Sequence, residues 1–169
     1  MSGFERGLII TPGTDRQLGT YGLFRPAPSQ QQVLELPSHD LAVRSAGPDL
    51  LWVGFAALCG GALGNADYGT LAGTFPAWVV DGVPSPAGEA AAGAAAAWHR
   101  FLEVLDTLRD RDIMLILISP RPLYWEAAAQ PAGPPSDVAA TLAGIADRLA
   151  VLRRVESDEQ LQDEQTSGC

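Results

Sequence analysis

The chain has no lysine. All eleven of its basic residues are arginine, against twenty acidic ones, and its formal net charge is −9. A P-loop of the form Gly-x-x-x-x-Gly-Lys-Ser/Thr is therefore excluded, because its lysine bridges the β- and γ-phosphates of the nucleotide. The acidic balance also argues against nucleic acid and anionic membranes, since both attract proteins through basic groups. We expect no nucleic-acid partner and no hydrolysis of ATP by this chain alone.

Cysteine and long apolar runs are scarce as well. The only cysteines are Cys59 and Cys169, which excludes a disulfide framework. Together with His39 and His99 they show no close spacing of the kind that zinc sites use, so we expect no metal. The longest apolar run, residues 113–118, is far too short to cross a membrane, and the N-terminus lacks the apolar run of a signal peptide. These absences predict a cytoplasmic protein with no transmembrane segment.

What remains is enough apolar sequence to fill one core, since hydrophobic residues make up 47% of the chain. Residues 1–32 are rich in Gly, Pro and Gln and are predicted to form a loop-rich segment. Residues 156–169 carry five acidic residues and no basic one, which is typical of a disordered tail. The α/β domain is therefore placed at residues 33–155.

Hydrophobic periodicity divides that domain into short strands and amphipathic helices. Strands are predicted around residues 33–36, 41–43, 50–53, 77–81 and 113–119, and helices over 66–74, 94–110 and from Ser136 onward. The segment 13–20, GTDRQLGT, follows no apolar strand of the right kind and is predicted as loop. Strand, helix and strand over 77–119 form a βαβ unit, which makes a parallel pair. The expected fold is α/β: a small parallel or mixed sheet with flanking helices, preceded by a short β-hairpin or meander.

Two predicted strands end in polar residues, and these ends are the best candidates for a site. The stretch AWVVD closes on Asp81, as a Walker B strand closes on the acid that holds Mg²⁺, and Ser119 ends the next strand. Ligands gather at such carboxyl ends in open α/β sheets. Arg100 and Arg121 are candidates to hold an anion there. The competing interpretation of Asp81-Gly82 is ordinary turn chemistry.

Other constellations are weaker. His99, Asp106 and Ser119 suggest a triad, but the first two lie two helical turns apart and Ser119 lacks the strand–turn–helix context of a nucleophile. The helix face that carries His99 and Asp106 is therefore interpreted as solvated. Cys59 is interpreted as a buried structural thiol, with a nucleophile activated by His39 as the alternative.

Between residues 33 and 125, short motifs follow one another in a fixed order: Trp52-x-x-Phe55-x-x-Leu58-Cys59, Asp67-Tyr68, Leu71, Phe75, VVDGVP, HRFLEVLD and ISPRPLY. This series resembles the C-terminal half of ZapE-like ATPases, AAA-type P-loop proteins linked to bacterial cell division. In that family a strand ends in Phe-x-x-Leu-Cys, and a loop leads to Asp-Tyr at a helix start. The resemblance thus implies a structural role for Phe55, Leu58, Cys59, Asp67 and Tyr68.

The departures from the family pattern define the functional expectation. The Walker A and Walker B half, which should precede residue 33, is absent, and Ala140 and Gly144 stand where arginines are expected. The chain is therefore interpreted as a truncated or degenerate ZapE-like C-terminal module, non-catalytic by itself. No cofactor is expected for it alone, although ATP and Mg²⁺ serve the full-length family.

Such a module is expected to act by binding protein: the ATPase half, other subunits or cell-division proteins. A sheet cut at its P-loop side leaves unpaired backbone groups, which either residues 1–45 or another chain must cover. The alternative is a small α/β nucleotide- or phosphate-binding enzyme with its site near Asp81 and Ser119.

Overall fold

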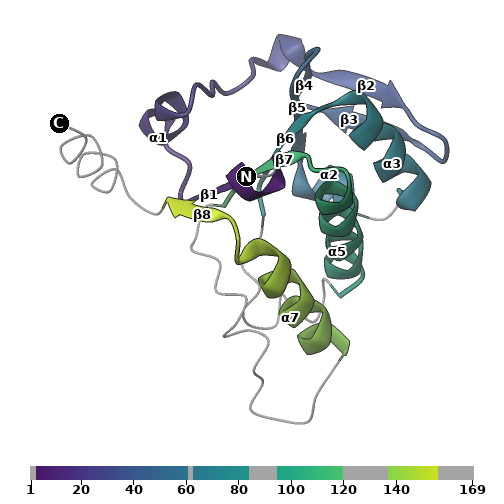
Figure 1. Ribbon diagram of the computed structural model, residues 1–169. Helices are drawn as coiled ribbons and strands as arrows, with labels where there is room; N and C mark the ends of the chain where they lie inside the picture. Colours follow the sequence, from purple (N-terminus) through teal and green to yellow (C-terminus); the bar gives the residue numbers. More distant parts are fainter. Residues whose placement is uncertain (1–2, 61–62, 84–94, 120–136, 156–169) are drawn as a thin grey trace.

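The computed structural model describes residues 3–60, 63–83, 95–119 and 137–155. Its centre is a six-stranded sheet in the order β4 (Ser45–Ala46), β5 (Leu51–Gly54), β6 (Ala77–Asp81), β7 (Met114–Ile118), β1 (Leu8–Ile10) and β8 (Arg153–Val155). Neighbouring strands run parallel except β4, which is antiparallel to β5. A separate antiparallel hairpin joins β2 (Gln32–Glu35) and β3 (Asp40–Val43) (Figure 1). The predicted α/β fold class is confirmed.

Helices cover the two faces of the sheet unequally. One face packs against α2 (Phe55–Cys59), α3 (Asn65–Thr74), α5 (Ala95–Asp110) and α7 (Asp137–Leu149). The opposite face packs against α1 (Asp15–Thr20) and the chain that follows it, which lie on the other side of the sheet in Figure 1. Two single 3-10 turns, η1 (Phe4–Arg6) and η2 (Pro28–Gln30), complete the described elements.

The central strands β6 and β7 are buried on both faces, as their continuous apolar sequence predicts. Side chains alternate along a strand, so Val79 and Ile116 pack on the α1 side. Val80 and Leu117 pack on the α5 side. Two apolar faces on one strand require cover on both sides, which makes the domain doubly wound.

The amphipathic stripe of α5 forms the centre of the larger core. Trp98, Phe101, Leu105 and Leu108 are each at most 1% exposed, so the predicted buried face of this helix is confirmed. Phe55 of α2 packs against this stripe, with its ring centroid 5.2 Å from that of Trp98 and 5.4 Å from that of Phe101. These separations are typical of favourable aromatic pairs.

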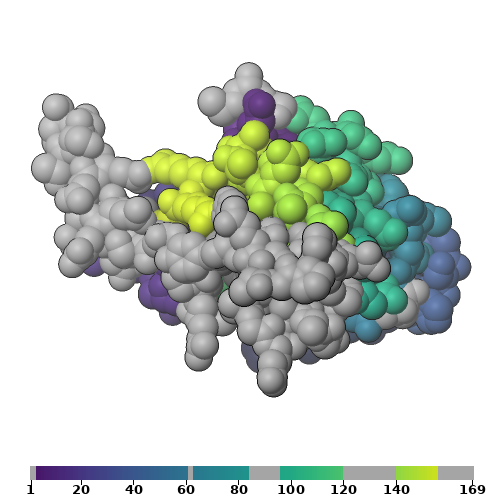
Figure 2. Space-filling view, turned by 90° about the horizontal axis from the view of Figure 1, so that it is seen from below, coloured from purple at the N-terminus to yellow at the C-terminus, as the bar shows by residue number. Residues whose placement is uncertain are grey.

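Part of the polar side of α5 meets α7, but His99 is exposed and the Asp106 side chain is 40% exposed, so the interpretation of this face as solvated holds for both residues. The Thr141 hydroxyl of α7 lies 3.2 Å from His99 Nδ1. Asp106 pairs with Arg148, whose Nη1 also donates to the Gly144 carbonyl. In Figure 2 the yellow-green surface of α7 adjoins the green surface of α5. Polar groups on two helices thus partner each other at the rim of a buried interface.

Among the helices and strands, the sequence prediction missed five elements: β1, α1, β4, α2 and β8. The prediction of residues 13–20 as loop is wrong, because β1 precedes this segment and α1 occupies most of it. β1 lies between β7 and β8, with Ile10 opposite Ile118 on one side and Val155 on the other. The prediction named residues 1–45 or another chain as the cover for the cut edge of the sheet. The structure shows the first, because residues 8–10 pair with β7.

No helix among the described residues combines the length and the apolar character that crossing a membrane requires.

Candidate functional site

The carboxyl ends of the parallel strands meet at one edge of the sheet. The chain leaves β1 toward α1 on one face, whereas α7, which follows β7, lies on the opposite face. The junction of β1 and β7 is thus a topological switch point, the place where doubly wound sheets bind their ligands. A cleft of about 410 Å³ opens at this edge, and its lining includes Arg25, Arg44, Trp52, Asp81 and Ile118.

Asp81, the last residue of β6, lies in the wall of this cleft and is only 7% exposed. Its Oδ2 accepts a hydrogen bond from Trp52 Nε1 at 2.6 Å and lies 2.5 Å from Arg44 Nε. A buried carboxylate needs such partners, because an unpaired charge is costly to bury. The charge of Asp81 is therefore already paired through Oδ2, and a cation at this position would compete with Arg44 for it.

Ser119 follows β7 at the same edge but is fully buried. Its hydroxyl donates to the Val83 carbonyl at 2.9 Å, and its N–H donates to the Ile10 carbonyl at 3.1 Å. The structure therefore brings Asp81 and Ser119 to one edge, as predicted from the strand ends. The Ser119 side chain thus ties the segment that follows β6 to the end of β7.

The loop between β1 and α1 occupies the position where doubly wound domains cradle phosphate with backbone N–H groups. In this protein the buried side chain of Gln17 takes the place of the phosphate as the acceptor for such N–H groups. Its Oε1 accepts from the N–H groups of Gly13 and Thr14, both at 2.9 Å, and its Nε2 donates to the Thr11 carbonyl at 2.8 Å. Gln17 is fully buried, so one side chain satisfies three backbone groups of the loop.

Gly13 allows the loop to approach β7. Its φ of +87° is in the left-handed region, and a Cβ there would lie 2.4 Å from Ile118 Cγ2. Any side chain would push the loop away from the strand, so glycine is required by both space and backbone conformation.

Arg25 reaches the same loop from the chain that follows α1. Its Nη2 donates to the Gly13 carbonyl, and its Nε donates to Asp15 Oδ1 at 3.3 Å. Half of the Arg25 side chain is exposed, as is half of the Arg44 side chain. The cleft therefore has two arginines in its wall, and each is held in place by an aspartate.

Arg100, one of the two predicted arginines, lies elsewhere. Arg100 is on α5, on the other face of the sheet, where its Nη1 donates to the Cys59 carbonyl at 3.4 Å. It contacts the last residue of α2 and does not line the cleft of Asp81. Arg121 lies outside the described residues, so its prediction stays a prediction.

The suggested triad is not assembled. His99 contacts Thr141, Asp106 pairs with Arg148, and the Ser119 hydroxyl bonds to Val83. Nor do the described residues contain any group of three or more His, Cys, Asp or Glu side chains placed to hold a metal ion. The chemistry available at this edge is therefore that of arginine, amide and a neutralised carboxylate.

The motif residues of α2 and α3 hold the helical layer together. Phe55, Leu58 and Cys59 are buried, and the Tyr68 hydroxyl donates to the Leu58 carbonyl at 3.0 Å. Burial raises the pKa of the Cys59 thiol well above its ordinary value, although the charge of Arg100 opposes the shift. A protonated buried thiol is a poor nucleophile, so the geometry favours the structural interpretation of Cys59. The helix predicted in this region begins after Gly64, and β5 ends at Gly54, so the Phe-x-x-Leu-Cys motif forms α2 rather than a strand.

Asp67 ties α3 to the hairpin. Its Oδ1 accepts from the Ser38 N–H and its Oδ2 from the Gly64 N–H, both at 2.9 Å. Burial alone would raise the pKa of Asp67, but these two hydrogen bonds favour the charged form and hold its pKa below the ordinary value of 3.8. The carboxylate therefore caps α3 through Gly64.

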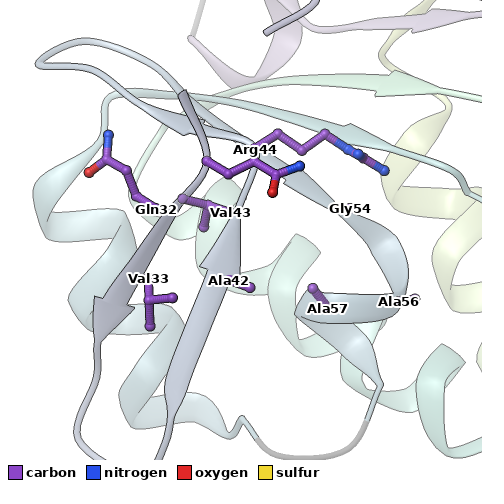
Figure 3. Close-up of a pocket in the computed structure, with 9 residues that line it drawn as sticks. Gln32, Val33, Ala42, Val43, Arg44, Gly54, Ala56 and Ala57 are labelled. Atoms are coloured by element: carbon purple, nitrogen blue, oxygen red, sulfur yellow. The ribbon is translucent and has the colours of Figure 1, made fainter. Parts of the chain in front are cut away.

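A second hollow of about 440 Å³ lies between the hairpin and α2 (Figure 3). Val33, Ala42 and Ala57 lie around it, and Val33 is 65% exposed. Arg44 shares this hollow, but its guanidinium extends toward Gly54 and Asp81. Short apolar side chains dominate the hollow, and it offers few groups for chemistry.

Sequence reasoning missed Gln17, Arg25 and Arg44 as members of the site. A signal for Gln17 was present: Thr14-x-x-Gln17 is a capping box, and the Thr14 hydroxyl accepts from the Gln17 N–H at 3.1 Å. The two arginines had no comparable signal, because only the folded sheet brings residues 25, 44 and 81 together.

This fold and this site define a doubly wound α/β domain with a cleft at its topological switch point, the general architecture of nucleotide-binding domains. A family model described as AFG1-like ATPase matches residues 14–154, and the chain belongs to that family. Comparison with curated proteins and with solved structures finds no significant match. The suspected resemblance to an ATPase of this type is thus confirmed at the level of the family.

Proposed function

We propose that this chain is a non-catalytic module of the AFG1-like ATPase type that acts by binding other proteins. The observation that carries the proposal is the state of the β1–α1 loop, in which Gln17 Oε1 accepts from the N–H groups of Gly13 and Thr14. In an active phosphate loop such donors face the nucleotide. Here these N–H groups donate to the buried Gln17 side chain, and the chain has no lysine that could bind the phosphates in their place.

Asp81 supports the same proposal. A Walker B acid must be available to Mg²⁺, whereas Asp81 pairs with Arg44 and accepts from Trp52. Displacing Arg44 would leave a guanidinium without its partner next to an incoming cation. Hydrolysis of Mg²⁺·ATP therefore lacks both its phosphate cradle and its metal ligand at this edge.

The test is steady-state phosphate release by the purified chain with ATP and Mg²⁺. We expect no release above a control that lacks protein. Release that requires Mg²⁺ and that disappears in Asp81→Ala would overturn the non-catalytic part of the proposal.

The binding part is tested by mixing the chain with an AFG1-like ATPase that carries an intact P-loop. We expect saturable association and a change in that enzyme's ATPase rate. The absence of both at micromolar concentrations would count against a partner in the ATPase half or in other subunits. A role in cell division rests on the resemblance alone. It is tested by a cross-linking experiment that asks whether cell-division proteins are among the partners cross-linked to this chain.

The alternative enzyme, with a site at Asp81 and Ser119, is favoured by one observation: the cleft of about 410 Å³ is within the range of small-molecule sites. It predicts saturable binding of a nucleotide or phosphate compound that Asp81→Ala abolishes. A ligand at a hundred times its Kd should stabilise the fold by about 2.7 kcal/mol, a shift that thermal unfolding detects.

A further inference from the structure

We propose that the cleft at the carboxyl ends of the strands binds a small phosphate monoester through Arg25 and Arg44, without a metal ion. This goes beyond the proposed function, because it assigns a ligand to residues that take no part in ATP hydrolysis. It also differs from the enzyme considered above, in which Asp81 would hold a cation.

The two arginines are placed to act as a pair. Arg25 is anchored at the β1–α1 loop by Gly13 and Asp15, and Arg44 is anchored at the end of β6 by Asp81. Gly13 packs against Ile118 of β7, and β7 is the direct neighbour of β6, so the two anchor points are separated by the interval between neighbouring strands. Both arginines line the cleft across that interval.

Each guanidinium keeps donors for a ligand. Arginine carries five N–H groups in a rigid fork, and each anchoring aspartate takes only part of that fork. Arg44 contacts Asp81 through Nε, and Arg25 contacts its two partners through Nε and Nη2. An arginine already held by a carboxylate loses less entropy when a ligand binds, which favours a preorganised site.

The charges of the cleft favour an anion over a cation. Asp81 and Arg44 cancel each other at close range. Asp15 is 90% exposed, so water screens its charge far more than it screens the loop side of Arg25. The Arg25 end of the cleft is therefore the more favourable place for an anion, although the net charge of −9 lowers the affinity at long range.

Gln17 explains why the anion would lie on the arginines and not in the loop. The Gly13 and Thr14 N–H groups already donate to Gln17. The remaining wall, with Pro12, Trp52 and Ile118, is apolar and suits the organic part of an ester. A phosphate group offers more oxygens to two arginine forks than a carboxylate does.

The experiment is a titration of the ¹⁵N-labelled full chain with inorganic phosphate and with AMP, at constant ionic strength, with EDTA present. We expect saturable shifts of the backbone signals of Gly13, Arg25, Arg44 and Gly82, unchanged when Mg²⁺ replaces EDTA. Arg25→Gln should raise the Kd by about tenfold or more, because charge-assisted hydrogen bonds are lost.

Arg109→Gln is the matched control. Arg109 also has a half-exposed side chain paired with an aspartate, Asp106, but it lies on α5, away from the cleft. Its replacement should change the Kd less than twofold. The proposal is overturned if neither ligand gives saturable shifts, if binding requires Mg²⁺, or if the two variants weaken binding equally. Binding of phosphate but not of AMP would indicate an adventitious ion only and would also overturn it. None of these outcomes depends on ATP hydrolysis, so failure here is distinguishable from failure of the proposed function.

Discussion

Replacing Gln17 with alanine removes three hydrogen bonds from the β1–α1 loop at once. The side chain is fully buried and serves the Gly13 N–H, the Thr14 N–H and the Thr11 carbonyl. Each such bond contributes about 1 kcal/mol net, and more where the group left behind stays buried. We therefore expect Gln17→Ala to lower the free energy of unfolding by about 2–4 kcal/mol.

Urea denaturation at constant pH measures this difference, and for a chain of this size a loss of about 3 kcal/mol corresponds to a fall in Tm of roughly 6–12 °C. Gln30→Ala is the control, because the Gln30 side chain also accepts a backbone N–H, that of Ala27 at 2.8 Å, but on an exposed 3-10 turn. Its replacement should change stability by less than about 0.5 kcal/mol. If both variants have the same effect, the β1–α1 loop does not depend on Gln17, and the argument for a self-occupied loop fails.

Three further predictions concern the rest of the domain. The folded protein holds the pKa of Asp67 below 3.8, so the contribution of this carboxylate to stability is complete above that pH and is lost as the pH falls through the lowered value. Asp67→Asn should therefore flatten the acid side of a plot of unfolding free energy against pH. An unchanged slope would refute the capping role. Arg44→Gln should lower the free energy of unfolding by about 1–2 kcal/mol in urea denaturation, because the nearly buried Asp81 keeps Trp52 as a hydrogen-bond donor but loses its ion pair. The loss is modest because half of the Arg44 side chain is exposed to water in the native protein. No loss would mean that Asp81 is satisfied without the ion pair. Phe101→Ala should cost about 3–5 kcal/mol, since this side chain is fully buried among aromatic rings; a cost below that of an exposed substitution would place it outside the core.

Long apolar patterns were predictable because they express burial directly. The run of β7 and the stripe of α5 each contain enough apolar residues to identify the element, and both lie where the sequence placed them. β1 and β8 have only three residues each. Such short strands exist because neighbouring strands pair with them, as Ile10 pairs with Ile118, and a pattern of three residues cannot express that partnership.

The candidate site was predictable only in part. Asp81 and Ser119 follow buried strands, so their shared edge could be inferred from topology. Their partners could not, because Arg44 and Val83 reach them through tertiary packing. For the same reason the sequence could not show that Arg100 does not line the cleft of Asp81. It lies on a helix in the correct βαβ unit, but that helix covers the other face of the sheet.

The polar groups at this edge show how a doubly wound framework can exist without its nucleotide. Buried donors and acceptors must be paired, and in a phosphate-binding loop the ligand supplies part of that pairing. In this protein Gln17 pairs with the loop, Arg44 with Asp81, and Ser119 with Val83. A ligand that needed those groups would have to compete with bonds already made. The N–H groups of Arg25 and Arg44 that do not bond to the anchoring partners have no such bond to give up. A ligand is therefore to be sought at the arginines and not at the loop.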